Sequence, residues 1–347
     1  MIRKKVYPKS FFYILIPFIL VSLSIILFCK IKRGHQFLGQ QIVVMKGWEG
    51  FADRLQVLSH CLHYCKLHNA AICIDWRDYM WGQESLDFSD YFEIINVPVV
   101  TLSDVIERVK QGAVISPPAW TLETLSVVNN ESLRFKEYEC EFNNSYDRID
   151  AEIIVTNCKG IRTYHIDNLI SNIRLKKNIA EIISSRLQNV EIPYTVIHLR
   201  GTDRLAESSL EDSIKPAVEL IKVQPPHINA RMYVISDMKQ MVDMWVDYFP
   251  QTKKLYSDYE IYKLPDNLRS GTHKMTKEVL EFYGLKKHNM NIDTIFDFIV
   301  ISFSKWCFGN SKESTYTKMG KFIGQSGKIG VSKWLGGFYP VTSSLKT

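Results

Sequence analysis

The sequence predicts an α/β protein with two Rossmann-like domains that face a cleft, preceded by one transmembrane helix. Three observations carry this prediction. Residues 11–29 contain no charged side chain, strand-like and helix-like segments alternate through the rest of the chain, and about 300 residues follow a short polar stem. Alternation of this kind predicts parallel sheets whose sites lie at the carboxyl ends of the strands. The length suits two domains.

The first 40 residues predict a membrane attachment: a tail at 1–10, a transmembrane anchor at 11–29 and a stem at 30–40. Nineteen helical residues at 1.5 Å each span about 30 Å, the thickness of a hydrocarbon core. A cleaved signal peptide would need small residues before its cleavage site, and residues 28–32 (Phe-Cys-Lys-Ile-Lys) offer none. Basic residues flank the segment on both sides, so its orientation stays open.

Residues 41–190 are expected to form the amino-terminal domain. It opens with a β-rich run at 41–45, a glycine-containing turn and a helix from about 52 to 68. Apolar residues recur on one face of that helix at helical spacing: Leu55, Leu58, Leu62 and Cys65. Further strands are expected at 71–75, 98–102, 113–116 and 153–158, and one long helix at 167–187.

Residues 191–347 are expected to form the carboxyl-terminal domain, where the alternation resumes. Strands are expected at 194–199, 231–236, 254–256 and 306–309. Helices are expected at 210–223, from about 238, at 293–303 and at 312–323. The two sets of elements have the same form, and we therefore expect the cleft between two similar sheets.

Charge argues against nucleic acid as a partner. The formal net charge is +6, but residues 1–33 hold seven Lys and Arg and no Asp or Glu, so the remainder carries −1. Binding to a phosphate backbone needs clustered basic charge on the folded domain. A nearly neutral body lacks that property.

The sharpest local pattern is the strand end at 196–204. His198 and Arg200 lie two residues apart, so they share one face of a strand. Arg200 then stands at the mouth of the sheet, where its planar guanidinium suits a phosphate, and Asp203 can hold it from behind. An ion-paired strand end with a structural histidine remains the alternative interpretation.

Two helix starts give weaker indications of an anion site. Gly47 and Gly50 flank the first turn, and Asn310 or Ser311 would cap the last helix. Free amides at a helix start bind phosphate, and glycine lets a ligand approach the backbone closely. A plain helix cap is the alternative for the second position.

No metal site is expected. His60, His63 and His68 spread around one helix, and Cys65 lies on its core face, which indicates solvated histidines and buried cysteines. The chain contains no Asp-x-Asp. A Gly-x-Ser-x-Gly nucleophile elbow is also lacking, so a hydrolase of that type is not indicated.

In this order the motifs resemble those of GDP-fucose-dependent fucosyltransferases, closest to the nodulation (NodZ-type) and core α1,6-fucosyltransferase group. His198-Leu199-Arg200-Gly201-Thr202-Asp203-Arg204 is similar to that group's His-x-Arg-Arg-Thr-Asp-Lys motif. Residues 231–237 resemble its second motif, 297–314 its third, and 47–55 the glycine turn that opens its amino-terminal half. The likeness is strongest from about 194 to 325.

The resemblance implies a GT-B fold and an inverting, metal-independent transfer of fucose from GDP-fucose to a glycan acceptor, with no cofactor. The first domain would hold the acceptor and the second the GDP-sugar. Arg200 would neutralise the diphosphate, His198, Asp237 and Asp297 would contact the donor, and backbone near Ser311 and Ser314 would hold phosphate. Asp203 and Glu207 are the candidate catalytic carboxylates, because an inverting displacement needs a base.

The resemblance also bears on compartment and on rival functions. A eukaryotic source would imply a Golgi type II protein, and a bacterial source an inner-membrane protein with a cytosolic body. The chain departs from the motifs where Gly201 replaces an Arg, Arg204 a Lys and Met238 an Asp. A catalytically silent nucleotide- or sugar-binding relative, or a transferase that uses another GDP-sugar, therefore stays open.

Overall fold

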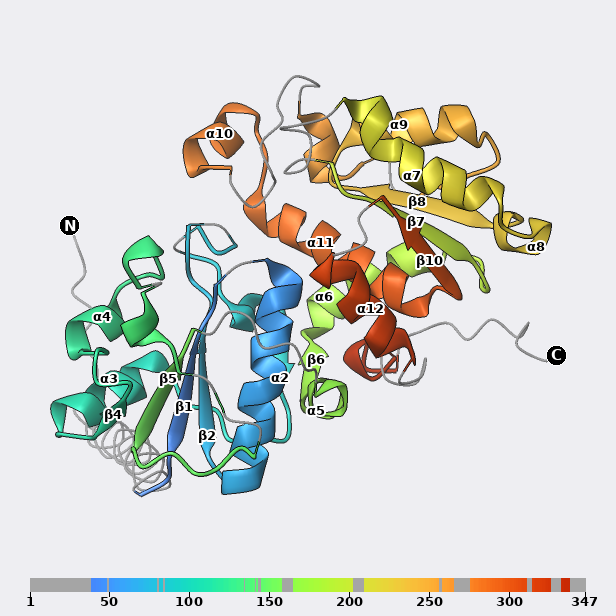
Figure 1. Cartoon of the computed structure of the whole chain (residues 1–347). Helices are drawn as coiled ribbons and strands as arrows, with labels where there is room; N and C mark the ends of the chain where they lie inside the picture. Colours follow the sequence, from blue (N-terminus) through green and yellow to red (C-terminus); the bar gives the residue numbers. More distant parts are fainter. Residues whose placement is uncertain are drawn as a thin grey trace, which may run out of the picture.

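The computed structural model shows two lobes, each built on a four-stranded parallel sheet (Figure 1). It describes residues 39–48, 50–79, 81–83, 85–133, 135–140, 142, 145–157, 165–201, 209–255, 258–264, 275–310, 314–325 and 332–337. The anchor expected at 11–29 lies outside these ranges. Within them, no helix has the length and apolar character needed to cross a membrane.

The amino-terminal lobe has the strand order β2-β1-β5-β4, with every neighbouring pair parallel. Its strands are β1 (Ile42–Lys46), β2 (Ala71–Asp75), β4 (Ile115–Ser116) and β5 (Ile153–Thr156). Helix α2 (Phe51–His68) lies on the side of the sheet that faces the other lobe, and α3 (Leu102–Lys110) and α4 (Leu122–Ser126) lie away from it (Figure 1). The alternation of strands and helices is confirmed.

Two predicted elements of this lobe need correction. The strand expected at 98–102 is reduced to an isolated bridge between Val99 and Ile72, because α3 begins at Leu102 behind the Thr101 cap. The long helix expected at 167–187 is wrong. It is split into α5 (Ile166–Asn172) and α6 (Lys177–Leu187) by strand β6.

Strand β6 (Ile173–Leu175) pairs antiparallel with β3 (Phe92–Ile94). Its outer residues, Ile173 and Leu175, are buried, while Arg174 between them is exposed and forms an ion pair with Glu93 at 2.8 Å. This period-2 burial, supported by a cross-strand ion pair, overrides the helical character of the flanking residues.

The carboxyl-terminal lobe has the order β10-β7-β8-β9, again all parallel. Its strands are β7 (Thr195–Leu199), β8 (Met232–Ser236), β9 (Lys253–Lys254) and β10 (Trp306–Gly309). The chain leaves β7 for β8 on one side and returns to β10 on the other, so the strand order reverses between β7 and β10. Ligands of open α/β sheets bind in the crevice at such a reversal.

Helices complete this lobe: α7 (Leu210–Lys222), α8 (Pro226–Asn229), α9 (Lys239–Tyr248), α10 (Lys277–Phe282), α11 (Lys287–Phe303) and α12 (Thr315–Gln325). Short 3-10 turns occur at η1 (Phe88–Asp90), η2 (Glu131–Leu133), η3 (Lys136–Tyr138) and η4 (Glu260–Lys263). Helix α11 begins six residues before the predicted start at 293.

The two lobes share one buried apolar cluster. It includes Val43 and Ile154 of the first sheet and Val196 and Tyr233 of the second. Helices α11 and α12 lie between the sheets (Figure 1), and α12 contacts both α11 and α2. The α11–α12 contact is close, since a methyl group at Gly320 would lie 2.7 Å from the Ile301 side chain. This packing holds α12 against both α11 and α2.

Candidate active site

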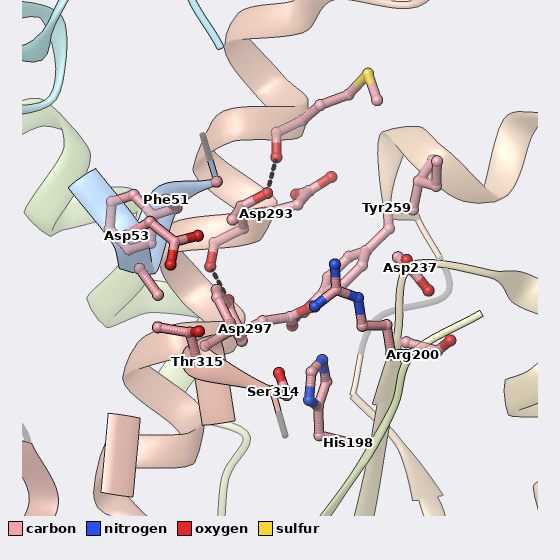
Figure 2. A pocket seen from close by; sticks show the side chains of 17 residues that line it. Phe51, Asp53, His198, Arg200, Asp237, Tyr259, Asp293, Asp297, Ser314 and Thr315 are labelled. Carbon is pink, nitrogen blue, oxygen red and sulfur yellow. Dashed lines mark hydrogen bonds between the residues drawn. The ribbon is translucent and has the colours of Figure 1, made fainter. Parts of the chain in front are cut away.

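A pocket opens between the lobes, at the carboxyl ends of β7 and β8 (Figure 2). It is lined from the amino-terminal lobe by the first turn of α2, and from the carboxyl-terminal lobe by the ends of β7 and β8, the segment around η4, the middle of α11 and the start of α12. Six predicted donor-binding residues line it: Gly50, His198, Arg200, Asp237, Asp297 and Ser314. Residues 150 positions apart in the sequence thus meet where the strand order predicts a ligand.

Asn310 holds the end of β7 next to β10. The Arg200 amide donates to Asn310 Oδ1 at 2.9 Å, and Asn310 Nδ2 donates to the Arg200 carbonyl at 3.0 Å. The preceding Gly309 permits the approach, because a Cβ there would lie 2.5 Å from the His198 carbonyl oxygen. Asn310 does not line the pocket. Its side chain extends the β7–β10 pairing by one residue and so positions Arg200.

Asp237 fixes the turn that follows Arg200, since its Oδ1 accepts the Gly201 amide at 2.7 Å. Gly201 also lies against Met238 and Met241: a Cβ at this glycine would be 3.0 Å from Met238 Cβ and from Met241 Sδ. The two motif departures, Gly201 and Met238, are therefore in contact. The motifs that this chain resembles carry an Arg at the position of Gly201 and an Asp at the position of Met238, so an apolar contact here replaces two charged residues.

His198 contributes a neutral ring to the pocket. Its Nδ1 lies 2.8 Å from Thr317 Oγ1, and its ring centroid is 5.3 Å from that of Tyr316. Burial, together with the positive charge of Arg200, lowers the pKa of His198 to about 4. At neutral pH the imidazole acts as a hydrogen-bonding group, and Arg200 supplies the positive charge.

Acidic and phenolic groups form another side of the pocket. Tyr259 Oη donates to Asp297 Oδ1 at 2.5 Å. Burial, reinforced by the charge of Asp293, raises the pKa of Asp297 well above its usual range. Asp293 Oδ1 pairs with Arg186 at 2.7 Å and its Oδ2 accepts the Glu260 amide at 2.9 Å. This environment favours the protonated form of Asp297, and both oxygens of Asp293 are bonded to other groups of the protein.

The start of α12 brings backbone amides to the pocket. Ser314 is 2% exposed, and its hydroxyl accepts the Thr317 amide at 3.4 Å. Ser314, Thr315 and Tyr316 all line the pocket. Amides of a helix's first turn carry a partial positive charge and bind anions. Together with the Arg200 guanidinium, this helix start can hold a phosphate.

Gly47, predicted as a donor contact, is not among the lining residues. Its amide donates to the Asp75 carbonyl at 2.7 Å and its carbonyl accepts from Asn129 Nδ2 at 2.9 Å. A Cβ at Gly47 would lie 2.5 Å from Trp76 Cδ1 and would also meet Arg54. The glycine is required by the packing of the turn, and Gly50, at the cap of α2, is the one that reaches the pocket.

Three predicted residues, Asp203, Glu207 and Ser311, lie outside the described part of the chain. Sequence reasoning missed Asp53, Tyr259 and Asp293, which line the pocket. Asp293 could have been found, because it lies four residues before the predicted Asp297 and therefore on the same face of a helix that is otherwise apolar. Asp53 and Tyr259 gave no such signal.

The histidines of α2 also need correction, since His60 is 1% exposed and not solvated. His60 Nδ1 contacts the Tyr146 hydroxyl, which lies 2.7 Å from His165 Nε2. His63 stacks on His165 with centroids 4.0 Å apart. Burial lowers the pKa of both His63 and His165. Across the described ranges, no group of three or more His, Cys, Asp or Glu side chains has the geometry of a metal site.

A larger cavity of about 680 Å³ lies within the amino-terminal lobe, beside β2 and α3. Arg77 and Lys176 line it, and Arg77 pairs with Asp75 at 2.9 Å. Phe92 lines this cavity and stacks on Phe51, which lines the first pocket, with centroids 6.0 Å apart. This aromatic pair therefore lies between the two, and Arg200 and the start of α12 line the smaller interlobe pocket.

Comparison with known proteins identifies the architecture. No protein-family model matches the sequence, and no curated protein matches it. Among solved structures, fucosyltransferase NodZ from Bradyrhizobium superposes with a TM-score of 0.57 at 18% identity, covering 82% of this chain and 94% of that one.

Two further structures agree. NodZ α-1,6-fucosyltransferase co-crystallized with GDP gives a TM-score of 0.56 at 16% identity, covering 82% and 93% of the two chains. The same enzyme soaked with GDP-fucose gives 0.53 at 17%, with the same coverage. The chain therefore has the fold of the NodZ fucosyltransferase, a GDP-fucose fucosyltransferase-like α/β fold with two parallel sheets.

Proposed function

We propose that this protein is a glycosyltransferase that transfers fucose from GDP-fucose to a glycan acceptor. One observation carries the proposal: Arg200 and the start of α12 meet at the strand-order reversal of the carboxyl-terminal sheet. Two of the NodZ structures that share this fold were determined with GDP or GDP-fucose, which supports a GDP-sugar as the ligand. The motif order from 194 to 325 supports the same donor.

The proposed reaction is an inverting displacement that needs no metal. The acceptor oxygen attacks C1 of fucose, the bond from C1 to the β-phosphate oxygen breaks, and its electron pair passes to GDP. Negative charge then grows on the diphosphate. The Arg200 guanidinium and the amides near Ser314 are fixed at the pocket, so they stabilise that charge without reorganising.

Ligand-induced stabilisation tests the proposal directly. The full-length chain in detergent is heated with GDP, GDP-fucose, GDP-mannose or UDP-sugars, with EDTA present, and Arg200→Ala is measured in parallel. We expect GDP and GDP-fucose to raise the melting temperature of the wild type but not of the variant, since only the folded state binds the ligand. No shift with any nucleotide would contradict the proposal.

We also infer that residues 11–29 anchor the protein as a single-pass membrane helix. Nineteen uncharged residues between basic flanks support this inference. In a eukaryotic cell the body would lie in the Golgi lumen. In a bacterium it would face the cytosol, where GDP-fucose is made. Alkaline carbonate extraction tests the anchor, because release of the full-length chain from membranes would contradict it.

A catalytically silent relative is the second candidate. The observation that favours it is the Gly201–Met238 contact, which replaces two charged motif positions with an apolar contact. This candidate predicts that GDP binds but that GDP-fucose is never consumed in the presence of a glycan panel. Turnover of GDP-mannose in place of GDP-fucose would instead identify a transferase for another GDP-sugar.

A further inference from the structure

We propose that Asp53 is the general base that accepts the proton of the acceptor hydroxyl. This inference rests on the proposed function, since it assigns a residue to that reaction. Asp53 stands in the first turn of α2 and lines the interlobe pocket. Figure 2 shows it on the opposite side of the pocket from Arg200.

The placement of Asp53 meets the geometry of an inverting displacement. The anion ligands, Arg200 and the start of α12, belong to the carboxyl-terminal lobe, so the leaving diphosphate lies on that side. The acceptor must attack C1 from the face opposite the leaving group. A carboxylate that projects into the pocket from the other lobe is placed on that face. Among the described residues that line the pocket, Asp53 is the one carboxylate from the amino-terminal lobe.

The other carboxylates that line the pocket belong to the carboxyl-terminal lobe, on the side of the leaving diphosphate. Asp237 accepts the Gly201 amide, and Asp293 is paired with Arg186. Asp297 accepts the Tyr259 hydroxyl, and burial raises its pKa well above the usual range, which favours its protonated form. Asp53 is half-buried, and a carboxylate in the first turn of a helix is stabilised by the helix dipole.

The acceptor oxygen forms a bond to C1 as the bond between C1 and the β-phosphate oxygen breaks. The electron pair of the broken bond stays on GDP, and the hydroxyl proton moves to the Asp53 carboxylate. Solvent then takes the proton from Asp53. A base in this position is expected to contribute a factor of about 10² to 10⁴ in rate.

A capping role is the competing explanation for Asp53. Gly50 caps α2, which makes Asp53 the third helical residue, and a Cβ at Gly50 would lie 3.4 Å from Asp53 Oδ2. An acidic side chain at that position often reaches back to the cap. The two roles separate on substitution, because Asp53→Asn keeps an oxygen acceptor for the cap but cannot take a proton.

Asp104 provides a matched control. It is also the third residue of a helix, in α3, and its Oδ2 accepts the Thr101 amide at 2.9 Å, far from the pocket lining. Asp104→Asn therefore repeats the chemical change at a capping carboxylate without a role in the reaction. Asp203→Asn and Glu207→Gln test the two carboxylates singled out by the sequence.

The experiment follows radiolabelled GDP-fucose with the full-length chain in detergent, first with water as the acceptor and then with sodium azide. Azide is already an anion and needs no base. We expect Asp53→Asn to keep the donor dissociation constant within threefold and to lose hydrolysis by about 10²-fold or more. With azide, the variant should form fucosyl azide at a rate close to that of the wild type. Asp104→Asn should match the wild type in all three measurements.

Other outcomes decide against the inference. Hydrolysis by Asp53→Asn at the wild-type rate, or loss of donor binding, or loss of the azide reaction as well, would assign Asp53 to the fold or to the donor site. A loss that follows Glu207→Gln or Asp203→Asn alone would place the base there. A wild type that reacts with azide but never with water would also overturn it. Failure of the wild type to bind GDP-fucose would instead contradict the proposed function.

Discussion

Asn310→Ala tests whether the end of β7 must be held for the donor to bind. The substitution removes the bonds of 2.9 Å and 3.0 Å that join the Asn310 side chain to the backbone of Arg200. Each such bond contributes about 1 kcal/mol, so the free energy of unfolding should fall by about 2 kcal/mol. Arg200 would then be ordered only on binding. Fixing one backbone residue costs about 1–2 kcal/mol, which predicts a GDP affinity about 5- to 30-fold weaker.

The assay combines urea unfolding with calorimetric GDP titration of the same preparations. Asn129→Ala is the control, because Asn129 Nδ2 likewise joins two strand ends, through the carbonyls of Gly47 and Asp75, but in the other sheet. It should lower stability by a similar amount and leave the GDP dissociation constant within twofold. A destabilised Asn310→Ala protein with unchanged GDP affinity would refute the reasoning, since Arg200 would then need no support from β10.

Three further predictions concern the pocket. The folded-state pKa of Asp297 lies above its unfolded value, so the contribution of its protonated carboxyl to stability is present at low pH and is lost as the pH rises. Asp297→Asn, whose amide oxygen still accepts from Tyr259, should not show this fall in the free energy of unfolding above about pH 4. Urea unfolding at several pH values measures it, and the same pH dependence in both proteins would contradict the prediction. For His198 the effect has the opposite sign, because its pKa falls from 6.5 to about 4 in the folded protein. As the pH is lowered from 6.5 to 4, the free energy of unfolding of the wild type should fall by up to about 3 kcal/mol through this residue, and His198→Asn should lack this decrease. Gly309→Ala places a methyl group 2.5 Å from the His198 carbonyl oxygen and should lower the free energy of unfolding by about 2 kcal/mol, with equal stability as the contrary result.

Elements with strong local patterns could be predicted from the sequence. The strand at 306–309 matches β10, and 71–75 matches β2, since both are short apolar runs bounded by turn residues. The single helix expected at 167–187 is wrong because residues 173–175, in its middle, pair as a strand with Phe92–Ile94, about 80 residues earlier in the chain. Pairing with a distant strand leaves no trace in local periodicity.

The candidate site shows the same division. His198 and Arg200 could be placed because alternation along a strand is a local property, and both line the pocket. The roles of Asn310 and Gly47 depend on distant backbone, the end of β7 in one case and Trp76 with Arg54 in the other. Asp53 belongs to the first helix, and only the approach of the lobes brings it to the same pocket as Arg200, on the opposite side.

The buried cluster that runs through both lobes has a consequence for folding cooperativity. Val43 and Val196 belong to different sheets but to one continuous core, and α12 returns from the second sheet to contact α2. Separating the lobes would expose apolar surface on both, and each Å² of apolar surface exposed to water costs about 25 cal/mol of free energy. Calorimetry should therefore record a single transition for the body. Cutting the chain near residue 190 is expected to yield two aggregation-prone fragments, not two independent modules.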